Sequence, residues 1–135
     1  MNINQKLPSR FDAVPEFSAS VIEQLCQELS LTETEIFDIK LVLEESLTNA
    51  IKHGNHMDSD LFVEVSIVTE GRNLVITVKD QGQGFDVSRV PDPTQKEQLM
   101  KTSGRGVYLM RKLMDEVRYC DGGHTIIMTK LFNSR

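Results

Sequence analysis

Two runs of β-branched residues, separated by a short turn, constrain the fold of this chain more than any other feature. Residues 61–69 and 74–79 are rich in valine and isoleucine, a composition typical of strands. The turn between them, Glu70 to Asn73, contains a glycine, so the segment predicts an antiparallel hairpin. One face of this hairpin would be apolar and must be covered by other elements. That face includes Leu74, Ile76 and Val78.

Two helical patterns upstream can supply the cover. The first begins near Pro15, a residue favoured in the first turn of a helix, and repeats apolar residues at helical spacing as far as Leu29. The second begins with Thr32 and Glu35, which are spaced as a capping box, and it ends at Gly54. Both helices therefore have an apolar side that can pack on the sheet.

The remaining segments complete a two-layer arrangement. Residues 3–7 predict a weak edge strand, and residues 117–132 predict a second hairpin around the turn 121–123. A third helix begins at the glycine-flanked segment 102–106. Its apolar side would carry Val107, Met110, Leu113, Met114 and Val117. The expected fold is α+β, a two-layer sandwich with helices on one face of a mostly antiparallel sheet, in a single domain spanning residues 1–135.

Composition excludes several classes of function. The net charge is −5 with no basic cluster, so we expect no nucleic-acid partner. No apolar run is long enough to span a membrane, and no signal peptide is evident, so we expect a cytoplasmic protein without membrane contact. Cys26 and Cys120 match no metal spacing and are expected to be reduced core thiols.

A polar pair on the second helix is the first candidate for chemistry. Glu45 and Asn49 are four residues apart, so their side chains lie on one face. The apolar stripe lies on the opposite side and consists of Ile36, Leu43, Leu47 and Ala50. A carboxylate in this position can accept a proton from a nucleophile, and an amide oxygen can ligate a hard cation such as Mg²⁺. A solvated helix face is the alternative.

A glycine-containing segment follows the second strand of the first hairpin. It reads Asp80-Gln81-Gly82-Gln83-Gly84-Phe85. Its glycines let the backbone turn tightly and approach a ligand closely, and Asp80 could accept a hydrogen bond from a ring amine. A bulged turn is the alternative.

A second glycine-flanked segment opens the third helix. The start of a helix presents free backbone N–H groups and the positive end of the dipole, which suits phosphate, and Arg105 adds charge there. A glycine hinge is the alternative. The preceding polar loop, 86–101, is long enough to be a lid, and 95–100 could form a short helical turn. The histidines His53, His56 and His124 form no convincing metal pattern, and surface or capping roles are expected.

Taken together, the three segments suit a purine nucleoside triphosphate, and their order resembles a known ATP-binding superfamily. That superfamily contains gyrase, heat-shock chaperone, sensor histidine kinases and mismatch-repair ATPases, which share the Bergerat-type fold. The closer resemblance is to the small serine kinases that act as bacterial anti-sigma factors. Residues 44–54 look like their N-box, 79–86 like their first glycine box and 103–110 like their second, so the likeness covers essentially the whole chain.

The resemblance implies a role for each motif. Asn49 would ligate a Mg²⁺ ion that bridges the phosphates of ATP, Glu45 would be the catalytic base, and Asp80 would bind the adenine amine. Other positions would contact the nucleotide. They are Lys52, His53, Gly82, Gly84, Gly104, Arg105, Gly106, Val107 and Thr125. Among these, Gly104 to Gly106 would hold the phosphates beneath the lid, and Thr125 would lie near the adenine.

The resemblance also implies partners. The phosphate acceptor would be a serine or threonine of a STAS-type anti-sigma factor antagonist, and the chain would also bind and inhibit a sigma factor. Relatives tend to dimerise, so a homodimer is an open expectation. Two alternatives remain at this point: a kinase of a STAS-containing regulator unrelated to sigma factors, and an ATP-gated protein-binding module with little kinase activity.

Overall fold

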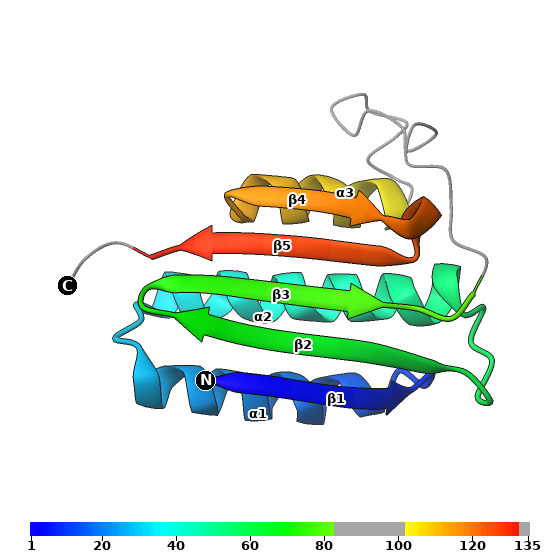
Figure 1. Ribbon diagram of the computed structural model, residues 1–135, viewed down its shortest axis with the longest axis horizontal. Coiled ribbons are helices and arrows are strands. Elements are labelled where there is room, and N and C mark those ends of the chain that lie inside the picture. Colours follow the sequence, from blue (N-terminus) through cyan, green and yellow to red (C-terminus); the bar gives the residue numbers. More distant parts are fainter. Residues whose placement is uncertain (83–101, 133–135) are drawn as a thin grey trace.

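Five strands form one antiparallel sheet in the order β1-β2-β3-β5-β4 within the part of the chain that the structure describes (Figure 1). They are β1 (Asn2–Pro8), β2 (Phe62–Glu70), β3 (Asn73–Lys79), β4 (Glu116–Cys120) and β5 (Thr125–Leu131). The β2–β3 and β4–β5 hairpins are the two predicted from sequence, and β1 lies at an edge as expected.

The structure is a computed structural model that describes residues 1–82 and 102–132, with only the backbone described at 102–105. The predicted lid loop at 86–101, its helical turn at 95–100 and Gly84 therefore lie outside the described residues.

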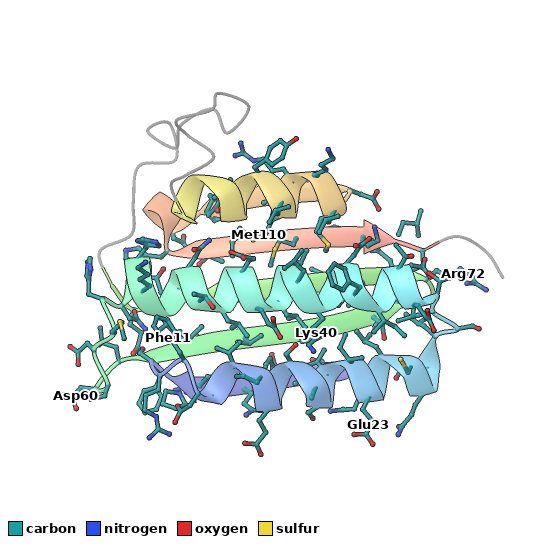
Figure 2. All side chains as sticks on the ribbon, turned by 180° about the vertical axis from the view of Figure 1, so that it is seen from behind. Phe11, Glu23, Lys40, Asp60, Arg72 and Met110 are labelled. Atoms are coloured by element: carbon teal, nitrogen blue, oxygen red, sulfur yellow. The ribbon has the colours of Figure 1, made fainter. Side chains whose placement is uncertain are left out.

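Three helices cover one face of the sheet. They are α1 (Ala13–Glu28), α2 (Glu33–Asn49) and α3 (Thr102–Leu113). Figure 2 shows them side by side from behind, with α2 between α1 and α3, and α2 contacts both neighbours. The molecule is therefore the expected α+β fold with helices on one face of the sheet.

The start and the end of α2 both follow from its sequence. Oγ1 of Thr32 accepts a hydrogen bond from the N–H of Glu35 at 3.1 Å, and the Glu35 carboxylate accepts one from the N–H of Thr32 at 2.9 Å. This reciprocal capping box fixes the first turn. Beyond Asn49 the chain continues as a π-helical turn, η1 (Ala50–Gly54), and leaves the helix at Gly54 as predicted.

The core lies between the two layers. Its fully buried members come from both hairpins and from all three helices; they include Leu25, Ile39, Leu43, Leu47, Ile67, Leu74, Ile76, Met110 and Met128. The apolar face predicted for β3 is thus buried against the helices, as expected.

Three details differ from the sequence-based expectation or add to it. The third helix ends at Leu113, and Val117 lies in β4, because the chain reverses at 114–115 to start the last hairpin. Cys26 is exposed on α1 and Cys120 is half-buried, so neither is the expected core thiol. Within the described ranges, no helix combines the length and the apolar character needed to cross a membrane.

The topology brings four element ends to one side of the molecule. The C-terminal ends of α2 and β3 lie beside the N-terminal ends of α3 and β5, at the right of Figure 1. The described residues of all three candidate motifs are located at these ends.

Candidate functional site

The start of α3 packs directly on the polar face of α2. A Cβ atom placed on Gly106 would lie 2.9 Å from Oε2 of Glu45 and 3.0 Å from Nδ2 of Asn49. A side chain on residue 106 would push the ends of these two side chains aside, so glycine lets them keep their positions beside the helix backbone. Glu45 and Asn49 are therefore not on a plain solvated face, because they meet the segment predicted to hold phosphate.

Two buried polar atoms on the same side of α2 and η1 lack partners. Oδ1 of Asn49 and Nε2 of His53 receive no hydrogen bond from any described residue. An unpaired buried acceptor is unfavourable by roughly 1–3 kcal/mol, and such atoms are rare in folded proteins. An amide oxygen in this state is ready to ligate a hard cation or to accept a bond from a ligand.

Asp80 is held at the end of β3 by bonds from two sides. The side chain is 6% exposed, and the Asp80 N–H donates to the carbonyl of His124 at 2.9 Å. Oδ1 of the carboxylate accepts the N–H of Gly82 at 3.0 Å and lies 3.0 Å from Nδ1 of His124. Because an ionised carboxylate only accepts hydrogen bonds, Nδ1 of His124 carries the proton.

Two glycines from different motifs touch beside Asp80. A Cβ on Gly54 would lie 2.4 Å from Cγ and Oδ2 of Asp80, and a Cβ on Gly82 would lie 1.6 Å from the carbonyl oxygen of Gly54. The close approach expected of Gly82 is therefore made, in the described residues, to the backbone of Gly54. This contact joins the end of η1 to the turn that follows β3.

The buried side chain of Asn55 makes hydrogen bonds that link these segments to the N-terminal part of the chain. Its Oδ1 accepts the N–H of Gln81 at 2.7 Å, and its Nδ2 donates to Oγ of Ser9 at 2.8 Å and to the carbonyl of Phe62 at 3.1 Å. Asn55 and Ser9 are 1% and 2% exposed. A fully satisfied buried polar network of this kind fixes geometry, and here it holds the Asp80–Gly82 turn.

Three other residues that were predicted to contact the nucleotide differ in their burial; they are Thr125, Lys52 and His53. Thr125 is 7% exposed, its Oγ1 donates to Asp121 at 3.1 Å, and it pairs with Lys79 next to Asp80. Lys52 is exposed. Burial, followed by the charges of Lys52 and His56, lowers the pKa of His53, so its ring is neutral at neutral pH.

The phosphate-binding segment is only partly described. Gly104 and Arg105 lie in the first turns of α3, where the structure describes the backbone and not the Arg105 side chain. Val107 is 4% exposed and its side chain belongs to the core. Any contact of Val107 with a nucleotide would therefore involve its backbone and not its side chain.

The side chains at this site fit a cation that is bound by the protein together with the phosphates of a ligand. Among the described residues, no group of three His, Cys, Asp or Glu side chains could hold a metal ion. Mg²⁺ keeps several waters and is usually bound through few protein oxygens together with substrate phosphates. The orphaned Oδ1 belongs to the Asn49 amide, whose Nδ2 lies next to Gly106 of α3, and it suits that mode of binding.

Three residues of this site were missed by sequence reasoning. His124 was expected on the surface or in a cap and instead contacts Asp80. Asn55 and Ser9 carried no signal, because each is an ordinary polar residue in a loop. The Asn55–Ser9 contact spans 46 residues of sequence, and no local pattern encodes it.

The sequence of this chain is similar to sequences of known proteins. The family model described as "Histidine kinase-like ATPase domain" matches residues 7–130. An anti-sigma F factor of Anoxybacillus flavithermus is 35% identical over 104 residues, covering 75% of this chain and 70% of the relative. An anti-sigma F factor of Bacillus cereus is 32% identical over 124 residues, covering 87% of this chain and 84% of the relative.

A solved structure shows the same fold. It is the crystal structure of the RsbU and RsbW domains of a Mycobacterium tuberculosis protein, with a TM-score of 0.62 and 20% sequence identity. The match covers 97% of this chain and 32% of that chain, so the present chain spans about a third of its length.

Proposed function

The chain belongs to the histidine kinase-like ATPase family, among the anti-sigma factor kinases, and from this premise we propose that it is an ATP-dependent serine/threonine kinase. Its proposed substrate is a STAS-type anti-sigma factor antagonist, and its second proposed partner is a sigma factor that it sequesters. The observation that carries the proposal is the contact of Gly106 with both Glu45 and Asn49. That contact supports the proposal because it brings a carboxylate, the proposed base, and an amide, the proposed cation ligand, beside the start of a helix.

Each of these groups has a task in phosphoryl transfer, which needs positioning and charge stabilisation more than covalent help. Asp80 accepts a hydrogen bond from the adenine amine. The first turn of α3 directs its N–H groups and dipole toward the phosphates. Oδ1 of Asn49 would hold Mg²⁺, and the ion would supply positive charge that stabilises the phosphate oxygens.

Glu45 acts on the acceptor. The partner's hydroxyl oxygen forms a bond to the γ-phosphorus, the bond from that phosphorus to the oxygen retained by ADP breaks, and the hydroxyl proton goes to the Glu45 carboxylate. The products are ADP and the phosphorylated partner. Glu45 supports this role because its half-buried carboxylate lies beside Gly106 in the first part of α3.

A transfer assay tests the proposal. The full chain is incubated with Mg-ATP and the STAS protein encoded nearest to its gene, and the STAS protein is analysed by mass spectrometry. We expect one added phosphate on a serine or threonine, and no addition when Mg²⁺ is chelated. Calorimetric ATP binding without any transfer to this protein would contradict the kinase assignment for that partner.

The sigma-factor part is tested separately. The chain loaded with ATP should retain the sigma factor encoded in the same region in a pull-down, and unphosphorylated STAS antagonist should release it. Retention of no sigma factor, together with efficient phosphorylation of the STAS protein, would mean that the kinase acts outside transcription.

A further inference from the structure

His124 holds Asp80 through both its backbone and its side chain. It follows η4 (Asp121–Gly123) and directly precedes β5. Its carbonyl accepts the Asp80 N–H at 2.9 Å, and its Nδ1 lies 3.0 Å from Oδ1 of Asp80. The proposed nucleotide-binding residues do not include His124, yet this side chain bonds directly to the one assigned to adenine.

The two carboxylate oxygens of Asp80 have different surroundings. Oδ1 accepts hydrogen bonds from Gly82 and from His124. Oδ2 receives none from the described residues and faces Gly54, whose missing side chain leaves room for it. One oxygen is therefore engaged by the protein, and the other is available to a ligand.

We propose that His124 is a positioning residue for base recognition, which holds the Asp80 carboxylate so that Oδ2 meets the exocyclic amine of adenine. This inference rests on the proposed function, in which Asp80 binds adenine. Adenine carries an amine donor where guanine carries a carbonyl acceptor, so a fixed carboxylate oxygen accepts a bond from the first and repels the second. A carboxylate free to rotate would bind adenine less tightly and discriminate less.

The burial of the contact supports a positioning role. Asp80 is 6% exposed, and the ring of His124 is 29% exposed. Hydrogen bonds to a charged group in such surroundings are stronger than exposed ones. The N–H of Gly82 comes from the turn that follows β3, whereas His124 lies just before β5. The two donors together therefore fix the carboxylate from two sides.

The test compares three substitutions of His124 in the full chain. Asparagine places an amide N–H near the position of Nδ1, glutamine places it near Nε2, and leucine removes the donor. The dissociation constants for ATP and GTP are measured by calorimetry, and thermal unfolding confirms that each variant is folded. His56→Asn, a change of an exposed histidine in the loop after η1, is the matched control.

We expect His124→Leu and His124→Gln to bind ATP about 10-fold more weakly and to lose most of the preference for ATP over GTP. His124→Asn should stay within about 3-fold of the wild type, and His56→Asn should not change. If leucine does not fold, the comparison of asparagine with glutamine decides. Equal affinity and equal base preference in these two variants would overturn the inference.

Different results would overturn adenine recognition at Asp80 and the positioning role of His124. A wild-type protein that binds ATP no better than GTP, and that is insensitive to Asp80→Asn, would overturn adenine recognition at Asp80 and this inference with it. A wild-type protein that prefers ATP, loses this preference in Asp80→Asn and keeps it in every His124 variant would overturn only the role of His124.

Discussion

At the scale of single residues, Asn49 shows how stability and function are opposed in this site. Its Oδ1 is buried without a partner among the described residues, which destabilises the free protein by roughly 1–3 kcal/mol. A cation or another ligand that binds here would give this oxygen a partner. Sites of this kind are often less stable than they would be without their functional groups.

Asn49→Ala should therefore separate stability from binding. We expect the free energy of unfolding to stay the same or rise by up to about 1 kcal/mol, because the unpaired oxygen is removed. The affinity for Mg-ATP should fall at least about 10-fold, while the affinity for metal-free ATP changes less. Urea unfolding and calorimetry measure the two quantities, and an unchanged dependence of ATP affinity on Mg²⁺ would exclude Asn49 as the ligand.

Gly106 and Gly82 provide a second contrast, because the atoms around them differ. A Cβ on Gly106 meets the ends of two side chains, which can move, whereas a Cβ on Gly82 meets the Gly54 carbonyl at 1.6 Å, which cannot. Gly106→Ala should thus lower phosphate transfer at least about 10-fold with less than about 1 kcal/mol of lost stability. Gly82→Ala should lose more than about 2 kcal/mol. Thermal unfolding and a transfer assay on both variants check this order, and the reverse order would refute the described packing.

At the scale of elements, the two ends of α2 have separate roles, one in stability and the other in the candidate site. Its N-terminus is stabilised by the Thr32–Glu35 capping box, and its C-terminal part carries Glu45 and Asn49 before η1. Glu45 lies thirteen positions after Thr32, which is about 20 Å along a helix. The cap should therefore affect stability without affecting the site.

Thr32→Ala tests that separation. Loss of the cap should reduce the free energy of unfolding by about 1 kcal/mol, measured by urea denaturation. Thr34→Ala, a change at an exposed position in the first turn of the same helix, is the control and should have little effect. ATP affinity should be the same in all three proteins, and a weakened affinity in Thr32→Ala would show that the two ends of α2 are coupled.

At the scale of the whole molecule, the pKa of Tyr119 in β4 shows whether the β4–β5 hairpin is packed into the fold. Burial raises its pKa to about 12, with the charge of Arg111 acting in the opposite direction. In the unfolded chain a tyrosine titrates near about 10. Between these values the unfolded state has released a proton that the folded state retains, so stability falls as the pH rises.

The expected result is a loss of stability that begins near pH 10 and continues toward pH 12. Tyr119→Phe should flatten the dependence of the unfolding free energy on pH across the accessible part of this range. Tyr108→Phe, on the outer part of α3 where Lys112 lies over the ring, should leave it unchanged. Identical slopes in wild type and Tyr119→Phe would mean that Tyr119 is not buried in solution.

The parts of the structure that local patterns encode could be predicted. The β-branched runs predicted the β2–β3 hairpin, Thr32 and Glu35 predicted the start of α2, and the four-residue spacing predicted that Glu45 and Asn49 share a face. These features depend on neighbours within a few residues, where propensity and periodicity act.

The contacts between motifs could not be predicted in the same way. Asp80 and His124 are 44 residues apart, and they meet only because β3 pairs with β5. The contact of Gly82 with Gly54 likewise depends on how η1 lies against the turn after β3. Such contacts are set by the packing of the two layers, and no residue pattern in one segment reports the other segment.

The most direct test of the central claim is the rate of phosphate transfer in Glu45→Gln. In the proposed mechanism the Glu45–Asn49 face is a phosphoryl-transfer site, and Glu45 is the base. Single-turnover transfer to the STAS protein at saturating Mg-ATP should fall at least about 100-fold, with ATP affinity within about 3-fold of the wild type. Glu44→Gln, one position earlier on α2, should transfer normally. Transfer by Glu45→Gln at the wild-type rate would contradict the account, whereas the predicted loss would establish Glu45 as the base.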